Sequence, residues 1–266
     1  MHKSDLDLIY NKYNKAERRL TDPVQFAYLY KDNVSAEIAA FISSALAYGR
    51  VEIIISDLKK VFNILGANIL DKITGDAKKL KKSFNDFKHR FNGGDDVTLL
   101  LLSLGRIIAE KKNLRNLFIE CWDKSGSDIK QTEIYFMNHI KSSIDFFLKK
   151  NQGFKPDYLN YLLASPEKNS ACKRLNLFLK WALRKDEIDP GIWENDLPHL
   201  KKYLVIPLDT HIAACARKSG LTSRKSNDWK TAVEITEALK KFAPDDPLKY
   251  DFAICHLGMD NIRMKK

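Results

Sequence analysis

Residues 205–212 read Val-Ile-Pro-Leu-Asp-Thr-His-Ile and predict a helix that starts behind a stiff loop. Pro207 fixes its own φ angle and biases Ile206 towards extended backbone. Asp209 is then the expected N-cap of a helix over residues 210–218, which Gly220 can end. A carboxylate at such a position is either a helix cap or a working acid, and both interpretations stay open.

Working outward from this stretch, nearly every periodic segment has helical spacing. Ile38, Ile42 and Leu46 recur at intervals of four and predict a helix over residues 35–48. The same spacing predicts helices over 53–65, 99–111, 114–124, 133–149, 156–164, 171–184, 229–242 and 247–257. Sustained apolar alternation, the signal of a strand, is almost absent. The predicted fold class is therefore all-α.

The composition favours a partner with negative charge. Lys and Arg total 45 against 34 Asp and Glu, which gives a net charge of +11. Such an excess favours polyanions, nucleic acid first. The 4 cysteines are far apart in the sequence, which argues for reduced thiols rather than disulfides. Since neither an apolar run of spanning length nor a secretory signal is visible, we expect a cytoplasmic, nucleoid-associated bacterial protein without membrane contact.

A lysine stands in an unfavourable place upstream of the Asp209 loop. With Ser170 as the expected N-cap, Lys173 takes the third helical position and Arg174 follows it. The helix dipole disfavours a cation there by about 0.3–1 kcal/mol. The dipole and Arg174 favour the neutral amine, a nucleophile that can form a Schiff base with a sugar aldehyde. The alternative is that both side chains project into water or bind a phosphate.

Together these segments resemble the helix-hairpin-helix GPD superfamily of DNA glycosylases. Residues 162–173 are similar to its hairpin, 207–211 to the loop that carries its essential aspartate, and 231–236 with 244–257 to its later helices. Lys173 matches the lysine of members that also cut the DNA strand. The long interval between lysine and aspartate is similar to that of the archaeal 8-oxoguanine glycosylase branch. The chain as a whole is also similar to a bacterial family of unknown function.

The resemblance implies a DNA-repair glycosylase with abasic-site lyase activity, acting on double-stranded DNA that carries a damaged base, such as an oxidised one. Lys173 would attack the sugar C1′, and Asp209 would assist deprotonation or stabilise positive charge. No cofactor and no protein partner are implied. The residues expected at the DNA are Lys168, Asn169, Ser170, Arg174, Lys201, Lys202, Thr210 and His211. The flipped base is expected in a pocket beside Tyr48, Arg50 and Trp229.

The implied architecture is a two-lobed helical bundle of the helix-hairpin-helix glycosylase type. The turn cluster at 91–96 predicts a boundary between an N-terminal lobe, 1–95, which borders the base pocket, and a lobe over 96–266. The second lobe carries the hairpin at about 156–184 and the aspartate loop at 205–212; one compact domain is the alternative. Family hairpins usually contain glycine, whereas this chain offers Asn169, the next most tolerant residue for a left-handed turn.

Two other functions remain open. A basic helical module could bind bent or damaged nucleic acid and perform no chemistry. His211 and Cys215 lie four residues apart, and Cys255 precedes His256, so four side chains of the types that hold zinc are present. Packing is the commoner role of such residues, and the cysteine pattern of an iron–sulfur cluster is missing. We therefore predict no metal site.

Overall fold

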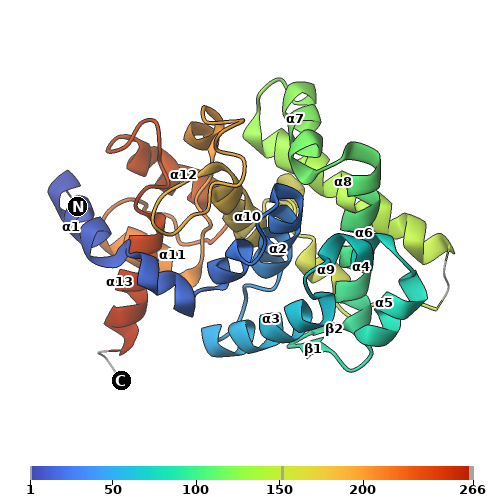
Figure 1. Ribbon diagram of the computed structural model, residues 1–266. Coiled ribbons are helices and arrows are strands. Elements are labelled where there is room, and N and C mark those ends of the chain that lie inside the picture. Colours follow the sequence, from blue (N-terminus) through green and yellow to red (C-terminus); the bar gives the residue numbers. More distant parts are fainter. Residues whose placement is uncertain (1, 151–152, 264–266) are drawn as a thin grey trace. The chain divides into compact units, whose positions relative to one another are not determined.

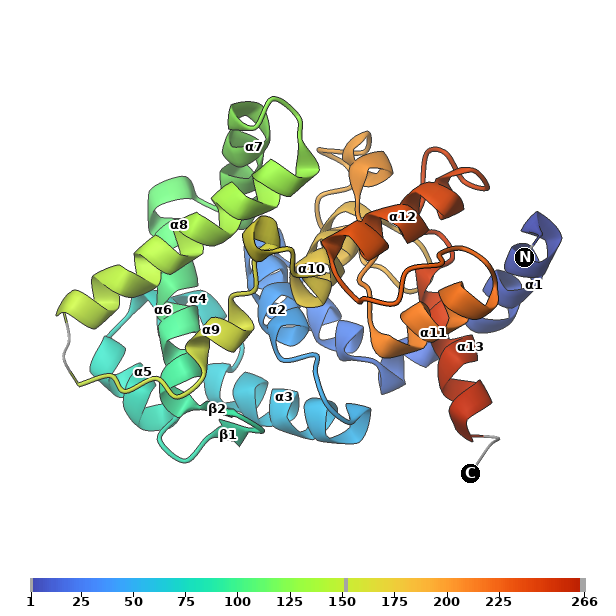
Figure 2. The same ribbon diagram turned by 180° about the vertical axis from the view of Figure 1, so that it is seen from behind.

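The structure is a computed structural model that describes residues 2–150 and 153–263 and is mostly helical (Figures 1 and 2), which confirms the predicted all-α class. The chain divides into two compact units: unit 1 contains residues 1–20 and 166–266, and unit 2 contains residues 21–165. Across the described ranges, no helix has both the length and the apolar character that a membrane crossing requires.

Unit 2 is built around a buried central helix, α6 (Gly94–Lys111), against which α4, α5, α7 and α8 pack (Figure 1). Leu99, Leu100, Leu101 and Leu102 follow one another along α6 and are all buried, as expected for a helix covered all round. A Cβ atom at Gly105 would lie 2.3 Å from the carbonyl oxygen of Ile73 in α4. Only glycine therefore permits this close crossing.

The remaining elements of unit 2 are joined by short connections. In chain order the elements are η2 (Pro23–Tyr28), α2 (Asn33–Ala45), α3 (Val51–Leu65), α4 (Ile69–Thr74), α5 (Ala77–Ser83), β1 (Lys88–His89), β2 (Asn92–Gly93), α6, α7 (Leu114–Lys124), α8 (Ile129–Lys150) and α9 (Leu159–Leu162). The two short strands pair antiparallel. Side chains cap several helix starts: Asp32 accepts a hydrogen bond from the Ser35 amide at 2.8 Å, and Asn113 accepts one from the Asn116 amide at 2.7 Å.

Unit 1 combines two segments that are distant in the sequence. Its elements are α1 (Lys3–Tyr13), η1 (Ala16–Thr21, at the division), η3 (Pro166–Lys168), α10 (Lys173–Leu183), η4 (Leu200–Tyr203), α11 (Thr210–Lys218), α12 (Trp229–Lys240) and α13 (Asp251–Arg263). Helix α13 packs against α1 and α11 (Figures 1 and 2). The Tyr13 hydroxyl donates to Asp260 at 2.8 Å, and the Tyr250 hydroxyl donates to Asp7 at 2.8 Å. These hydrogen bonds attach α1 to the C-terminal part of the unit.

A buried ionic cluster holds α10 in unit 1. Lys180 Nζ lies 2.6 Å from Asp251 Oδ2 and 3.5 Å from Asp189 Oδ1. The Arg184 guanidinium also pairs with Asp189, and with Asp186 and Asp246. Burial raises the pKa of Asp189 to about 7, against the lowering effect of Lys180 and Arg184. Removal of one partner from such a buried cluster costs about 3–5 kcal/mol, so these contacts fix the helix that begins at Lys173.

The division of the chain differs from the predicted boundary near residue 95. The turn cluster at 91–96 forms the end of the β1–β2 hairpin and the first turn of α6, both inside unit 2. Asp96 explains this continuity, because its carboxylate accepts a hydrogen bond from the Gly93 amide at 3.0 Å and so closes the start of α6. The cluster is a helix cap rather than a linker.

Candidate functional site

Asp209 is the N-cap of α11, as predicted. Its backbone is extended, with φ −115° and ψ −176°, and its Oδ1 accepts a hydrogen bond from the Ile212 amide at 2.8 Å. The loop before it, residues 204–208, is buried, and Pro207 stands where the chain turns from this loop to the helix. The buried loop before Asp209 and the hydrogen bond from the Ile212 amide therefore leave the Asp209 carboxylate little freedom to reorient.

The helix that carries Lys173 begins two residues later than predicted. Ser170 is not its N-cap: Ser170 forms an antiparallel bridge with Asp228, and its Oγ accepts a hydrogen bond from the Cys172 amide at 3.3 Å. Cys172 takes the N-cap position with φ 47°, and Lys173 is the first residue of α10. The bridge to Asp228 delays the helix, because it holds the chain extended at Ser170.

The hairpin loop that precedes α10 turns without glycine. Asn169 has φ 60°, which confirms the prediction of a left-handed residue there, and Cys172 is a second one. The Trp229 amide donates to the Asn169 carbonyl at 3.1 Å and ties the loop to α12. The first helix of the predicted hairpin, expected over 156–164, is only the short α9 and belongs to unit 2, whereas α10 belongs to unit 1.

The structure brings the predicted amine and carboxylate together. Lys173 Nζ lies 3.5 Å from Asp209 Oδ2, and the two side chains are 35% and 13% exposed. The same Oδ2 accepts a hydrogen bond from the Cys255 thiol of α13 at 3.6 Å. Oδ1 thus accepts the hydrogen bond that caps α11, and Oδ2 contacts both the Lys173 amine and the Cys255 thiol. A half-buried amine beside a half-buried carboxylate that can accept a proton is an arrangement that can support nucleophilic chemistry.

Cys255 is the member of this site that the sequence analysis missed. Its sequence neighbourhood indicates only a packing residue or a zinc ligand beside His256. No local pattern places it next to Asp209, since the contact depends on how α13 packs against α11. Gly258 permits part of that packing, because a Cβ atom there would come within 3.1 Å of His211 in α11.

The residues predicted to contact DNA differ in exposure. Lys168, Asn169 and Thr210 are exposed; Ser170, Arg174, Lys201, Lys202 and His211 are half-buried. Within the described residues, His211 Nδ1 is buried and has no hydrogen-bond partner. Lys168 and Asn169 in the hairpin loop and Thr210 at the start of α11 therefore remain the most accessible of the set.

The three residues predicted for the base pocket belong to different units. Tyr48 and Arg50 lie in unit 2, and Trp229 lies in unit 1. The Tyr48 hydroxyl donates to Asn92 Oδ1 at 2.6 Å, and Arg50 is the exposed N-cap residue of α3. Trp229 is only 5% exposed at the start of α12, so its ring belongs to the core and offers almost no face for stacking. The structure thus argues against Trp229 as a wall of a base pocket.

Comparison with known proteins gives a family without an assigned activity. Residues 22–260 match the family described as "Protein of unknown function (DUF2400)". The chain belongs to this family. The predicted similarity to a family of unknown function is thereby confirmed. No curated protein and no solved structure matches the chain. Lys173, Asp209 and Cys255 all lie inside the matched region of this family member.

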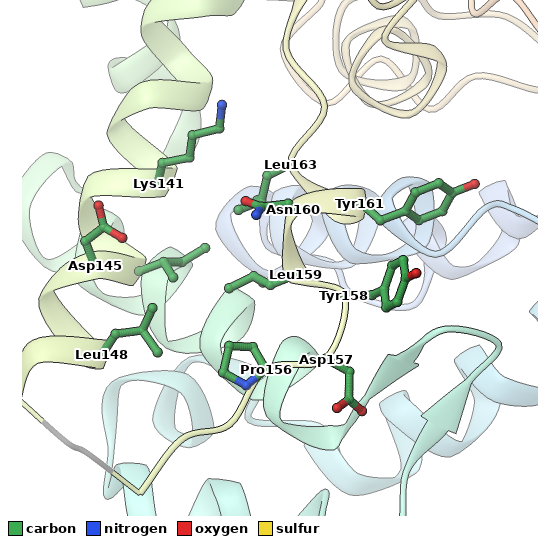
Figure 3. A pocket seen from close by; sticks show the side chains of 11 residues that line it. Lys141, Asp145, Leu148, Pro156, Asp157, Tyr158, Leu159, Asn160, Tyr161 and Leu163 are labelled. Carbon is green, nitrogen blue, oxygen red and sulfur yellow. The ribbon is translucent and has the colours of Figure 1, made fainter.

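A separate cavity of about 580 Å³ lies within unit 2. Lys141, Asp145 and Leu148 of α8 form one side, and Leu159 and Asn160 form the other (Figure 3). Its described lining includes none of the residues predicted for the base pocket. No local sequence pattern predicts this cavity, because it depends on how the non-helical residues 156–158 pass beside α8.

The residues considered for zinc do not form a cluster. Among the described residues, no three His, Cys, Asp or Glu side chains are placed to share a metal ion. His256 Nδ1 lies 3.0 Å from the Phe252 carbonyl oxygen, and its ring lies 4.0 Å from that of Phe252. Burial raises the pKa of the Cys215 thiol. His256 and Cys215 therefore have local packing roles in their helices.

Proposed function

We propose that this protein is a DNA glycosylase with abasic-site lyase activity, of the helix-hairpin-helix type, in which Lys173 is the nucleophile. The observation that carries the proposal is the 3.5 Å separation between Lys173 Nζ and Asp209 Oδ2. These side chains come from the starts of two helices that are distant in the sequence. A DNA substrate implies that the protein works at the nucleoid.

The chemistry needs an amine, a proton acceptor and a sugar. Asp209 Oδ2 takes a proton from Lys173, and the freed lone pair of Nζ forms a bond to the sugar C1′. The bond from C1′ to the base breaks, and its electron pair leaves with the base, which gains a proton. Opening of the C1′–O4′ bond then leaves a protonated imine. At a site that has already lost its base, the amine adds to the free aldehyde, and water leaves.

Strand cleavage follows from the same intermediate. Loss of a proton from C2′ of the imine expels the 3′ phosphate, and hydrolysis of the remaining imine regenerates the Lys173 amine. The exposed Lys168 and the half-buried Arg174 flank the nucleophile and supply positive charge for the DNA backbone. The net charge of +11 over the whole chain also favours binding to the negatively charged DNA backbone.

Borohydride trapping tests the proposal directly. Hydride reduces the imine to a stable amine, so wild-type protein and abasic-site duplex should yield a covalent adduct. Lys173→Ala should abolish the adduct, because no other amine is held beside Asp209 in the described structure. Lys218→Ala is the matched control: it removes an exposed lysine from the last turn of α11, at the opposite end of the helix from Asp209, and should leave the yield unchanged.

An adduct of undiminished yield with Lys173→Ala would exclude Lys173 as the nucleophile. A panel of duplexes with different damaged bases should then be used to identify the base that the wild-type protein releases. The lesion that gives the fastest release defines the substrate.

The second candidate is a nucleic-acid-binding module without chemistry. Two observations favour it: Asp209 already caps α11, and its pairing with Lys173 offsets the unfavourable placement of a cation at a helix start. The ion pair would then be structural. Tight binding to damaged duplex, with no base release and no trapped adduct from the wild type, would establish this module instead of the enzyme.

A further inference from the structure

Three aromatic side chains of unit 2 meet at the surface. Phe91, at the tip of the β1–β2 hairpin, is 49% exposed. Tyr158, the N-cap residue of α9, and Tyr161, within α9, are 56% and 42% exposed. The ring centre of Phe91 lies 5.5 Å from that of Tyr158 and 6.0 Å from that of Tyr161. Figure 3 shows both tyrosines on the side of their segment that faces away from α8. We name Phe91, Tyr158 and Tyr161 the aromatic surface.

Buried and partly buried hydrogen bonds hold this surface in place. Asn92, directly after Phe91, donates from its amide group to the Tyr158 carbonyl at 3.0 Å and to Asp96 Oδ2 at 2.9 Å. The Tyr158 amide donates to the same Asp96 oxygen at 3.2 Å. The Tyr48 ring supports Tyr161 from behind, with 4.9 Å between ring centres. The rings are therefore preorganised, and little conformational entropy is lost when a ligand stacks on them.

The neighbouring charge is mostly positive. The Arg90 guanidinium lies 5.5 Å from the centre of the Phe91 ring, and Lys88 is exposed on the same hairpin. Gly49 makes room for Arg90, since a Cβ atom there would lie 2.8 Å from Arg90 Cδ. Asp157 is an exposed acid beside Tyr158. Arg90 and Lys88 give the surface the charge that a phosphate backbone requires.

We propose that the aromatic surface binds the unstacked bases of single-stranded nucleic acid. Partly exposed rings beside cations form the usual platform for such bases, because every base has a face that can stack. A paired duplex hides those faces inside its own stack and should gain little from the rings. The surface is separate from the Lys173–Asp209 pair in residues and in unit, so the inference does not depend on the proposed catalysis.

Fluorescence anisotropy with a fluorescein-labelled oligothymidylate of about 12 nucleotides tests the inference. Phe91→Ala combined with Tyr158→Ala should weaken binding by roughly 5-fold to 100-fold. Binding to an intact duplex should change much less. The slope of log affinity against log salt should stay constant in this variant, because its cations remain, and should fall in Arg90→Ala.

Phe146→Ala is the matched control. Phe146 is a 40% exposed aromatic residue of unit 2 with the Arg106 guanidinium 4.1 Å from its ring centre, but it lies outside the aromatic surface. Its loss should leave oligothymidylate binding unchanged. An equal loss of affinity in Phe146→Ala, or unchanged affinity in the double variant, would overturn the inference. A wild type that binds no oligothymidylate at low salt would also overturn it, and the surface would then be read as a protein contact.

Two further measurements distinguish a loss of stacking from a loss of folding and from a loss of the proposed catalysis. Phe91→Leu keeps apolar bulk but removes the aromatic face, and it should lose affinity with an unchanged circular dichroism spectrum. Full affinity in this variant would contradict stacking. Borohydride trapping on an abasic duplex reports on Lys173, and the Phe91→Ala/Tyr158→Ala protein should retain it if the proposed function is correct. Loss of oligothymidylate binding with intact trapping therefore assigns the two properties to different residues.

Discussion

At the scale of single residues, the two oxygens of Asp209 have different tasks. Oδ1 completes the first turn of α11 through the Ile212 amide, and Oδ2 contacts Lys173 and Cys255. The same side chain is therefore both the helix cap and the candidate acid, two roles that sequence reasoning set against each other. Substitutions that keep one role and remove the other can separate them.

Asp209→Asn should preserve stability and damage chemistry. Asparagine is as good an N-cap as aspartate, so the free energy of unfolding in urea should change little. The rate of imine trapping should fall about 100-fold or more, because the proton acceptor beside Lys173 is lost. Asp209→Ala, which also removes the cap, should additionally cost about 1 kcal/mol of stability. If Asp209→Asn leaves the trapping rate unchanged and only Asp209→Ala lowers stability, the carboxylate acts only as a cap.

Sequence reasoning identified part of this site because some of the required signals are local. Pro207 followed by Asp209 predicts a capped helix from neighbours alone. The start of α10 was wrong by two residues, since the bridge between Ser170 and Asp228 outweighs the local capping preference of serine. The contact of Cys255 with Asp209 is a product of helix packing and has no local signature.

At the scale of one element, α8 carries an uncompensated carboxyl group. Glu133 is completely buried, and within the described structure neither of its carboxylate oxygens has a hydrogen-bond partner. Burial raises the pKa of Glu133 well above its ordinary value of 4.5. Between these two values the folded protein holds a proton that the unfolded chain has released. The free energy of unfolding therefore falls as pH rises through this window.

Glu133→Gln should remove that pH dependence. The variant and the wild type should unfold at similar urea concentrations below pH 4.5, where Glu133 is protonated in both states. At neutral pH the glutamine variant should be the more stable protein. Asp145→Asn, at an exposed position of the same helix, is the control and should follow the wild-type profile. Parallel profiles for Glu133→Gln and wild type would show that Glu133 is charged in the folded state.

The predictability of the elements follows the strength of their periodicity. The helix expected over 53–65 is α3, Val51–Leu65, and the one expected over 114–124 is α7 within the same bounds. The helix expected over 156–164 shrinks to α9, because the Tyr158 amide bonds to Asp96 of α6 instead of continuing a helix. The β1–β2 hairpin was missed, since strands of two residues are too short to show alternation.

At the scale of the whole molecule, the first residues belong to the same unit as the last helices. Leu6 of α1 is fully buried, whereas Leu8 on the same helix is 70% exposed. Leu6→Ala should destabilise unit 1 by about 2–5 kcal/mol, and Leu8→Ala should have an effect within about 0.5 kcal/mol. Hydrogen exchange provides the measurement: in Leu6→Ala the amides of α13 should exchange faster, while those of α6 in unit 2 keep their protection. Faster exchange in α6 alone would contradict this division of the chain.

The division of the chain into these two units could not be predicted from the sequence, for a physical reason. A turn cluster such as residues 91–96 can suggest a boundary between consecutive segments. It carries no information about a unit that closes through segments as distant as 1–20 and 166–266. Hydrogen bonds such as that between Tyr13 and Asp260 exist only after tertiary folding.

This discontinuous unit has a consequence for synthesis on the ribosome. Translation delivers α1 before residues 21–165 and its partner α13 after them, so α1 has no native partner for its apolar side, including Leu6, while the intervening residues are synthesised. Residues 21–165 emerge meanwhile as a contiguous segment and can fold while the ribosome is still adding α10 to α13. Lys173 and Asp209, the proposed nucleophile and its proton acceptor, both belong to the part of unit 1 that is synthesised after residues 21–165.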